Sequence, residues 1–148
     1  MKPKLIVMVG ISGSGKSTFV DGLKTSLNAT VVCPDDIRAE LTGDAEDQTQ
    51  NGRVFGIAKR RVGELLLQGK NVVIDATSPA IRDRKDWIKI ANESGAIPVA
   101  YFVRVDPATA KSRNAKRTRK VPEWVIDKQF AKLVPPTKSE GFDNVTVV

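Results

Sequence analysis

The sequence predicts an α/β protein built on a parallel sheet of about five strands, with helices on both faces. Short apolar runs alternate along the chain with segments of helical spacing, an order typical of parallel strands joined by crossover helices. The apolar runs are nearly continuous rather than alternating with polar residues, which indicates strands buried on both faces. Because such sheets bind ligands beyond the carboxyl ends of their strands, we expect the functional residues to follow those ends.

The first half of the chain is predicted to contain three strands, at residues 5–9, 29–33 and 71–75. Helical spacing predicts a helix over 16–27 and a short one from about 36 to 41, before a polar loop at 42–51. A longer amphipathic helix is predicted from apolar residues at three- and four-residue steps, and Gly69 is expected to end it. These residues are Val54, Ile57, Ala58, Val62, Leu65 and Leu66.

The second half is predicted to add a helix over 79–94, with Ile81, Ile88 and Ala91 facing inward, and a fourth strand over 97–105. Pro107 is suited to the first turn of a helix and opens a basic one. A further helix is expected over 122–133 before two prolines end it, and residues 144–148 are expected to close the sheet as a fifth strand.

The composition fits one domain covering residues 1–148, because 41% of the 148 residues are apolar and 28% are charged. The sequence has no histidine, which excludes catalytic triads and other mechanisms that need an imidazole. Cys33 is the one cysteine, so no internal disulfide is possible and a reducing cytoplasm is expected. No stretch approaches the roughly 20 apolar residues of a spanning helix, and no membrane partner is expected.

The loop after the first strand carries the most specific motif in the chain. Residues 10–17 read Gly-Ile-Ser-Gly-Ser-Gly-Lys-Ser and match G-x-x-x-x-G-K-[ST] between a predicted strand and a predicted helix. Such a loop turns its backbone N–H groups toward phosphates, its lysine reaches the β- and γ-phosphates, and its serine hydroxyl ligates Mg²⁺. We therefore expect Mg²⁺ and ATP to be bound by Gly10, Ser12, Gly13, Ser14, Gly15, Lys16, Ser17 and Thr18.

Acidic residues follow the second and third predicted strands. Asp35 lies just past the second, one helical turn before Arg38. It could accept the proton of an incoming hydroxyl while Arg38 holds an acceptor phosphate, or it could simply mark the start of a helix, where aspartate is favoured as the N-cap and in the first turn. Asp75 ends the third strand, where it could bind Mg²⁺ as in a Walker B motif or cap the following turn.

The excess charge of +7 is concentrated in one segment of the chain, since residues 107–120 contain six bases and no acid. This segment could be a solvated helix face, a nucleic-acid patch, or a lid at about 111–121 whose arginines close over phosphates; with the phosphate loop present, a lid is the favoured interpretation. Trp87 and Trp124 could stack on bases, but tryptophan at helical spacing more often belongs to the core.

Taken together, these motifs resemble phage-type 5′-hydroxyl polynucleotide kinases over roughly residues 3–132. The resemblance is carried by the phosphate loop, by Asp35-Asp-Ile-Arg38, by the strand end at Asp75, and by Arg113-Asn-Ala-Lys-Arg117 followed by Val121-Pro122. It implies transfer of the γ-phosphate of ATP to the 5′-OH end of DNA or RNA, in the cytoplasm of a host cell if the chain is phage-encoded.

The resemblance also implies individual roles. Asp35 would be the general base, Arg38 the clamp on the acceptor phosphate and Arg117 the lid arginine on the donor phosphates, while Arg113 and Val121 would flank the adenine. The Asp-x-Asp-x-Thr motif of the phosphatase module found in many members is absent. A kinase for small molecules such as antibiotics, sugars or nucleotide sugars is the alternative, and a nucleotide-dependent binding module without chemistry is a third possibility.

Overall fold

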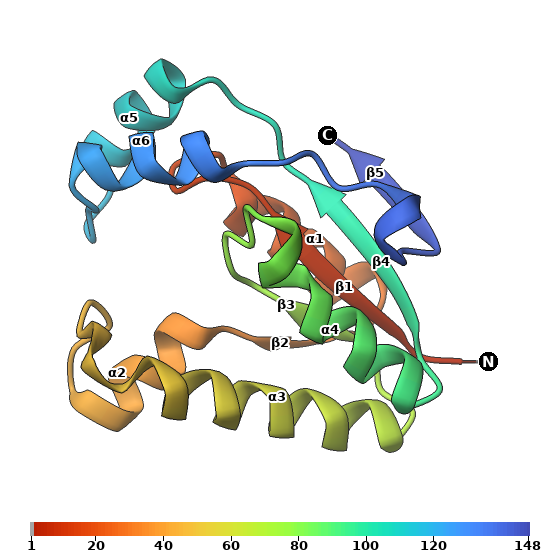
Figure 1. Ribbon diagram of the computed structural model, residues 1–148. Helices are drawn as coiled ribbons and strands as arrows, with labels where there is room; N and C mark the ends of the chain where they lie inside the picture. Colours follow the sequence, from red (N-terminus) through yellow and green to blue (C-terminus); the bar gives the residue numbers. More distant parts are fainter. Residues whose placement is uncertain (1) are drawn as a thin grey trace.

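Strand β1 (Lys4–Val9) lies at the centre of a five-stranded parallel sheet of order β2-β3-β1-β4-β5 in the computed structural model, which describes residues 2–148 (Figure 1). The sheet confirms the predicted fold class. Each expected strand is present but shorter at one end or both, apart from β1, which begins one residue earlier. The other strands are β2 (Thr30–Val32), β3 (Val72–Ile74), β4 (Ile97–Phe102) and β5 (Asn144–Val147).

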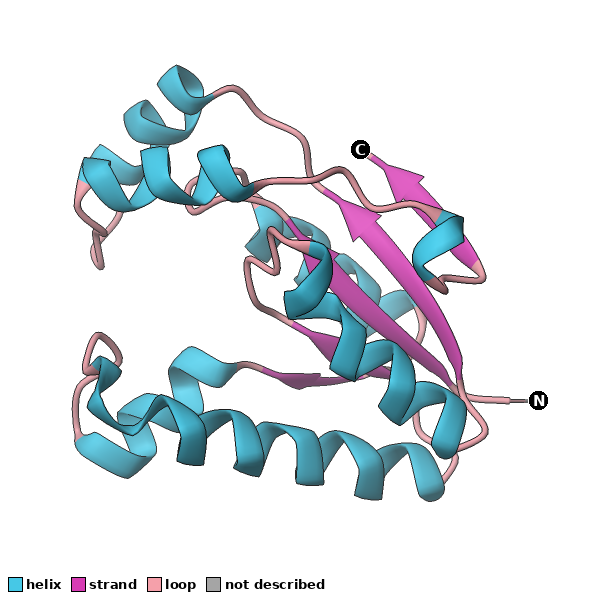
Figure 2. Ribbon diagram, viewed as in Figure 1, coloured by secondary structure: helices cyan, strands magenta, loops and turns pink. Residues whose placement is uncertain are grey.

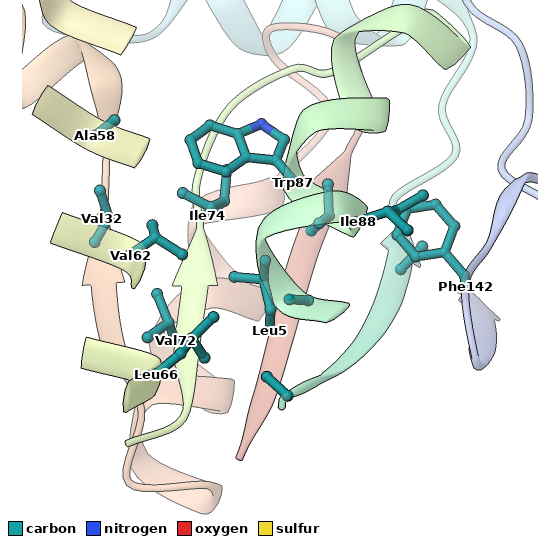
Figure 3. Close-up of a cluster of buried hydrophobic side chains, with 14 of the residues drawn as sticks. Leu5, Val32, Ala58, Val62, Leu66, Val72, Ile74, Trp87, Ile88 and Phe142 are labelled. Carbon is teal, nitrogen blue, oxygen red and sulfur yellow. The ribbon is translucent and has the colours of Figure 1, made fainter. Parts of the chain in front are cut away.

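The helices cover both faces of this sheet, which accounts for the continuous apolar strands. On one face, α3 and α4 pack on Leu5 and Val7 of β1, and Figure 3 shows part of this cluster around Trp87. On the other face, α1 packs on Ile6 and Met8. The helices are α1 (Lys16–Ser26), α2 (Pro34–Thr42), α3 (Asn51–Leu67), α4 (Ile81–Glu93), α5 (Pro107–Ala115) and α6 (Glu123–Lys132), with short 3₁₀ turns η1 (Gln48–Gln50) and η2 (Lys138–Glu140).

Two apolar side chains do not lie where helical spacing placed them. Ile81 was expected to face inward but is 48% exposed, because it is the first residue of α4 and lies beyond the turns that Trp87 and Ile88 anchor in the core. Trp124 is 65% exposed near the start of α6, whereas Trp87 is buried as a core residue. The preference of tryptophan for the core is therefore correct for Trp87 and wrong for Trp124.

A buried ion pair fixes the chain segments around the carboxyl end of β3. The fully buried Arg84 side chain donates to both carboxylate oxygens of Glu140, at 2.8 and 3.0 Å. Its remaining nitrogen donates to the carbonyl oxygens of Ser78, Pro79 and Val134. The loop after β3 and the segment between α6 and β5 are thereby held together, with all the polar groups of the arginine satisfied.

None of the helices in the described part of the chain combines the length and the apolar character that a membrane crossing requires.

Candidate active site

The phosphate loop connects β1 to α1 and is shaped by two glycines in the left-handed region. Gly13 has φ 82° and Gly15 has φ 94°, a conformation that side chains with a Cβ rarely adopt. A Cβ on Gly13 would also lie 3.0 Å from the Ala110 carbonyl carbon and closer still to its oxygen. The loop therefore bends tightly against the backbone of α5.

Lys16 folds back over this loop. Its ammonium donates to the carbonyl oxygens of Gly10 at 3.1 Å and Ile11 at 3.3 Å. Removal of the ammonium from water lowers the pKa of Lys16 to about 8; nearby Asp75 opposes this shift and Arg117 adds to it. Most Lys16 side chains are thus still cationic at neutral pH, in a poorly solvated position that suits an anionic ligand.

A cavity of about 300 Å³ opens above the loop and brings together most of the predicted site residues. Figure 2 shows the loops that surround it, gathered at the carboxyl end of the sheet and beneath α5 and α6. The predicted residues that line it are Ser12, Gly13, Gly15, Lys16, Ser17, Asp35, Asp75, Arg113, Arg117 and Val121, and they are joined by Cys33, Ala76, Thr77 and Arg119.

Four predicted residues do not line this cavity. Gly10 and Ser14 belong to the loop itself, where the buried Ser14 hydroxyl has no hydrogen-bond partner among residues 2–148. Thr18 is exposed on the first turn of α1. Arg38 is only 5% exposed at its side chain and lies behind Asp35.

Asp35 lies in the first turn of α2 and lines the cavity, but it does not cap the helix. The N-cap of α2 is Cys33, and the start of this helix has no side-chain cap hydrogen bond. The Asp35 carboxylate accepts from Arg38 Nη1 at 2.6 Å and from Arg119 Nη2 at 3.0 Å. It is therefore oriented by an arginine of its own helix and reached by one from the loop after α5.

Arg38 has contacts on several sides. Besides its contact with Asp35, it donates to Asn51 Oδ1 through Nε and Nη2, at 3.2 and 3.0 Å, and to the Ala45 carbonyl oxygen at 3.4 Å. In this arrangement it anchors the polar loop before α3 and holds the Asp35 carboxylate in place. Its predicted role on an acceptor phosphate stays a prediction.

Asp75 lies beside Lys16 at the end of β3. Within residues 2–148 its carboxylate makes no hydrogen bond to Thr77 or Ser78, so the structure does not place it as a cap. Burial raises the pKa of Asp75, and the Lys16 ammonium opposes that shift. Ser17 lines the same cavity, and a hydroxyl and a carboxylate match the oxygen ligands that Mg²⁺ takes alongside substrate phosphates.

The predicted lid consists of the end of α5 and the loop that leads to α6. Arg113 Nη1 donates to the Ser14 carbonyl oxygen at 2.9 Å, which joins α5 to the phosphate loop. The buried Asn114 amide pairs with the backbone of Val121, donating to its oxygen at 2.7 Å and accepting from its nitrogen at 3.0 Å. This pair closes the loop that carries Arg117 and Arg119.

Sequence reasoning assigned no role to Asn114, Arg119 or Gln129. Gln129 of α6 accepts from the Ser12 backbone N–H at 2.8 Å and donates to the Ser12 hydroxyl at 3.1 Å. Arg119 lies in the basic segment 107–120 and Asn114 lies between Arg113 and Arg117, so the sequence carries a weak signal for both. Nothing in the local sequence marks Gln129, because its partner lies 117 residues away.

Comparison with known proteins places the chain in a family. Residues 5–136 match the AAA_33 family, which is described as an AAA domain. The chain is 28% identical to the bifunctional polynucleotide phosphatase/kinase of Schizosaccharomyces pombe over 98% of its own length and 33% of that protein. It is 31% identical to the adenylyl-sulfate kinase of Pseudomonas aeruginosa over 80% of its own length and 61% of that protein.

Among solved structures, the Pnkp1/Rnl/Hen1 RNA repair complex contains a chain that is 29% identical, with a TM-score of 0.79. The match covers 88% of the present chain and 44% of that one. The chain thus spans a third of the Schizosaccharomyces pombe protein and less than half of the matched chain in the RNA repair complex. From its matched length, its sheet and its phosphate loop, the chain belongs to the AAA_33 family and has the P-loop kinase fold.

Proposed function

We propose that this chain is a single-domain kinase that transfers the γ-phosphate of ATP to the 5′-OH end of DNA or RNA. The observation that carries the proposal is the cavity of about 300 Å³, which places Lys16 and Arg117 together with the carboxylate of Asp35. A donor phosphate held by the two cations would have a proton acceptor within the same cavity. The relatives named as a polynucleotide phosphatase/kinase and as part of an RNA repair complex support a nucleic-acid acceptor.

The chemistry assigned to each residue follows from its position. Asp35 accepts the proton of the 5′-OH, whose oxygen bonds to the γ-phosphorus as the bond to the bridging oxygen of ADP breaks. Lys16 and Arg117 balance the charge on the transferring group. Arg119 donates to Asp35 Oδ2 at 3.0 Å and occupies one of the lone pairs of this oxygen, so the carboxylate keeps others for the proton of the 5′-OH.

The residues that would hold the metal ion and the nucleotide are those of the loop and its surroundings. Ser17 and Asp75 would bind Mg²⁺, which when bound neutralises charge on the β- and γ-phosphate oxygens. Gly10, Ser12, Gly13, Ser14, Gly15 and Thr18 would form the cradle for the phosphates, with Arg113 and Val121 beside the base. The segment at about 111–121 would act as the lid.

The test is transfer of label from γ-labelled ATP to a panel of acceptors. The panel contains 5′-OH oligonucleotides of DNA and of RNA, a 3′-nucleoside monophosphate, adenylyl sulfate and sugars. We expect labelling of the 5′-OH ends, abolished in Lys16→Ala, Asp35→Asn and Arg117→Ala but retained in Lys89→Ala, whose exposed side chain lies outside the cavity. Full activity of Asp35→Asn would remove the assignment of the base.

A small-molecule kinase is the second candidate, favoured by the 31% identity to an adenylyl-sulfate kinase. Labelling of adenylyl sulfate or a sugar without labelling of any 5′-OH end would select it. Binding of oligonucleotides without any labelled product would instead indicate a binding module.

A further inference from the structure

A second cavity, of about 430 Å³, lies between α4 and α6 and borders α3; we call it the α4–α6 groove. Ala76 and Thr77 line this groove and also line the catalytic cavity, so the two spaces meet at the loop after β3. In Figure 1, α6 lies above the first turns of α4, with α3 below them. A chain-like ligand that ends in the catalytic cavity could continue into the groove along this loop.

The groove carries an excess of positive charge. Lys59, Arg82, Lys128 and Lys132 line it against two acids, Asp83 and Asp86. The Lys59 ammonium pairs with the Asp86 carboxylate at 2.8 Å, and the Asp83 carboxylate accepts from the backbone N–H of Ala80 at 3.0 Å.

The other cations of the groove remain available for a ligand. Over residues 2–148 the structure contains no ion pair of Arg82, Lys128 or Lys132. Such a surface, joined to the catalytic cavity, is suited to a chain of phosphates.

Trp124 of α6 is not among the residues that line the groove and adds an exposed aromatic surface beside it. Trp124, Lys128 and Lys132 are spaced by four residues and therefore lie along one face of the helix. The Trp124 side chain is 65% exposed, so its ring is not needed to complete the core. Eight residues of helix span about 12 Å, which is the length of a few nucleotides of a single strand.

We propose that the α4–α6 groove binds the single-stranded part of the acceptor beyond its 5′ nucleotide. Lys128, Lys132 and Arg82 contact the backbone phosphates, and Trp124 stacks on a base. A single strand fits better than a duplex, because paired bases stack on each other and are not available to an aromatic side chain. This inference rests on the proposed function, since it assumes that the 5′-OH lies at Asp35.

The first experiment measures binding and does not depend on catalysis. A fluorescent single-stranded hexanucleotide with a 5′-phosphate is titrated with the wild type, with Lys128→Ala/Lys132→Ala, and with Lys85→Ala/Lys89→Ala. The last variant removes the same charge from exposed lysines of α4 outside the groove.

We expect the groove variant to bind at least about tenfold more weakly at low salt. Its plot of log affinity against log salt should be shallower by about 1.4, from about 0.7 for each lost phosphate contact. The control variant should match the wild type. Equal losses in the two double variants, or equal wild-type affinity for a blunt duplex, would overturn the proposal.

The second experiment tests stacking on Trp124. Trp124→Ala should weaken hexanucleotide binding by about 5- to 150-fold, the range for loss of one stacked base, and Trp124→Phe should restore most of it. Binding should also quench the fluorescence of the wild type much more than that of Trp124→Phe, in which only the buried Trp87 remains. Unchanged affinity in Trp124→Ala would exclude the stacking role.

The third experiment is kinetic and separates failure of the groove from failure of the proposed function. For Lys128→Ala/Lys132→Ala, KM should rise about tenfold for a hexanucleotide acceptor but stay unchanged for a 3′-nucleoside monophosphate and for ATP. Equal KM changes for short and long acceptors would refute the groove and leave the kinase assignment intact. Absence of any 5′-OH labelling by the wild type would refute the kinase assignment, while the binding titration still decides the groove.

Discussion

The contact between the phosphate loop and α5 leads to a quantitative prediction for three Gly→Ala variants. Gly13 combines a φ of 82° with a Cβ position that overlaps the Ala110 carbonyl group. The left-handed conformation costs a residue with a Cβ about 1–2 kcal/mol, and overpacking against backbone adds about 1–3 kcal/mol. Gly13→Ala should therefore lower the free energy of unfolding by about 2–5 kcal/mol.

The two other variants isolate these contributions. Gly15 has a φ of 94°, but its Cβ would meet only Arg113 Nη1, at 3.4 Å, so Gly15→Ala should cost the conformational part alone, about 1–2 kcal/mol. Gly22 lies within α1 with nothing within 4 Å of an added Cβ. Gly22→Ala should stabilise the protein by about 0.5–1 kcal/mol, because alanine loses less backbone entropy in a helix.

Chemical denaturation of the ligand-free protein measures all three free energies, and thermal unfolding supports them. At about 2–4 °C per kcal/mol for a chain near this size, Gly13→Ala should lower Tm by about 4–20 °C. Equal stability of Gly13→Ala and Gly15→Ala would refute the close approach of the loop to α5. Destabilisation by Gly22→Ala would show that the space beside Gly22 does not admit a methyl group.

Three further outcomes follow from the site. Gln129→Ala removes both hydrogen bonds to Ser12, each worth about 0.5–1.5 kcal/mol, and should weaken nucleotide binding about 5- to 150-fold by loosening the phosphate loop. An unchanged Kd for a fluorescent nucleotide would remove this positioning role. Asn114→Ala should raise the rate of protease cleavage in the loop before Val121, because both hydrogen bonds between the Asn114 amide and the Val121 backbone are lost. Asn114→Asp should lose only the hydrogen bond that the amide nitrogen donates. Equal cleavage of the wild type and Asn114→Ala would show that these two bonds do not hold the loop closed. The pKa of Lys16 in the free protein is lowered to about 8, and a bound triphosphate favours the cationic form, so affinity for nucleotide should fall as pH rises through 8, by up to about tenfold per pH unit. The Lys16→Arg side chain stays charged, so this variant should show no such fall. A flat wild-type profile between about pH 7 and pH 9.5 would contradict the role of Lys16 in nucleotide binding.

The burial of both sheet faces was predictable from local sequence patterns. Nearly continuous apolar runs at β1 and β3 indicate strands covered on both sides, and the structure covers them with α1 on one face and with α3 and α4 on the other. Helix ends were predicted to within a few residues, since proline at the start of α5 and glycine after α3 act locally. The predictions for Ile81 and Trp124 were wrong because periodicity indicates which face of a helix is apolar, but not which turns of that face are covered by other elements of the fold.

By itself, the sequence determined the α/β class, the phosphate loop and the set of chemical groups available, because these depend on residue type and on spacing over a few positions. Only the tertiary structure decided that Asp35 turns toward the cavity and meets Arg119, that Gln129 braces Ser12, and that the face of α6 carrying Trp124 stays exposed. The two contacts join segments far apart along the chain, and the exposed face of α6 is one that no distant segment within residues 2–148 covers. Their geometry is set by how helices pack across the carboxyl end of the sheet, and no local pattern of residues encodes that packing.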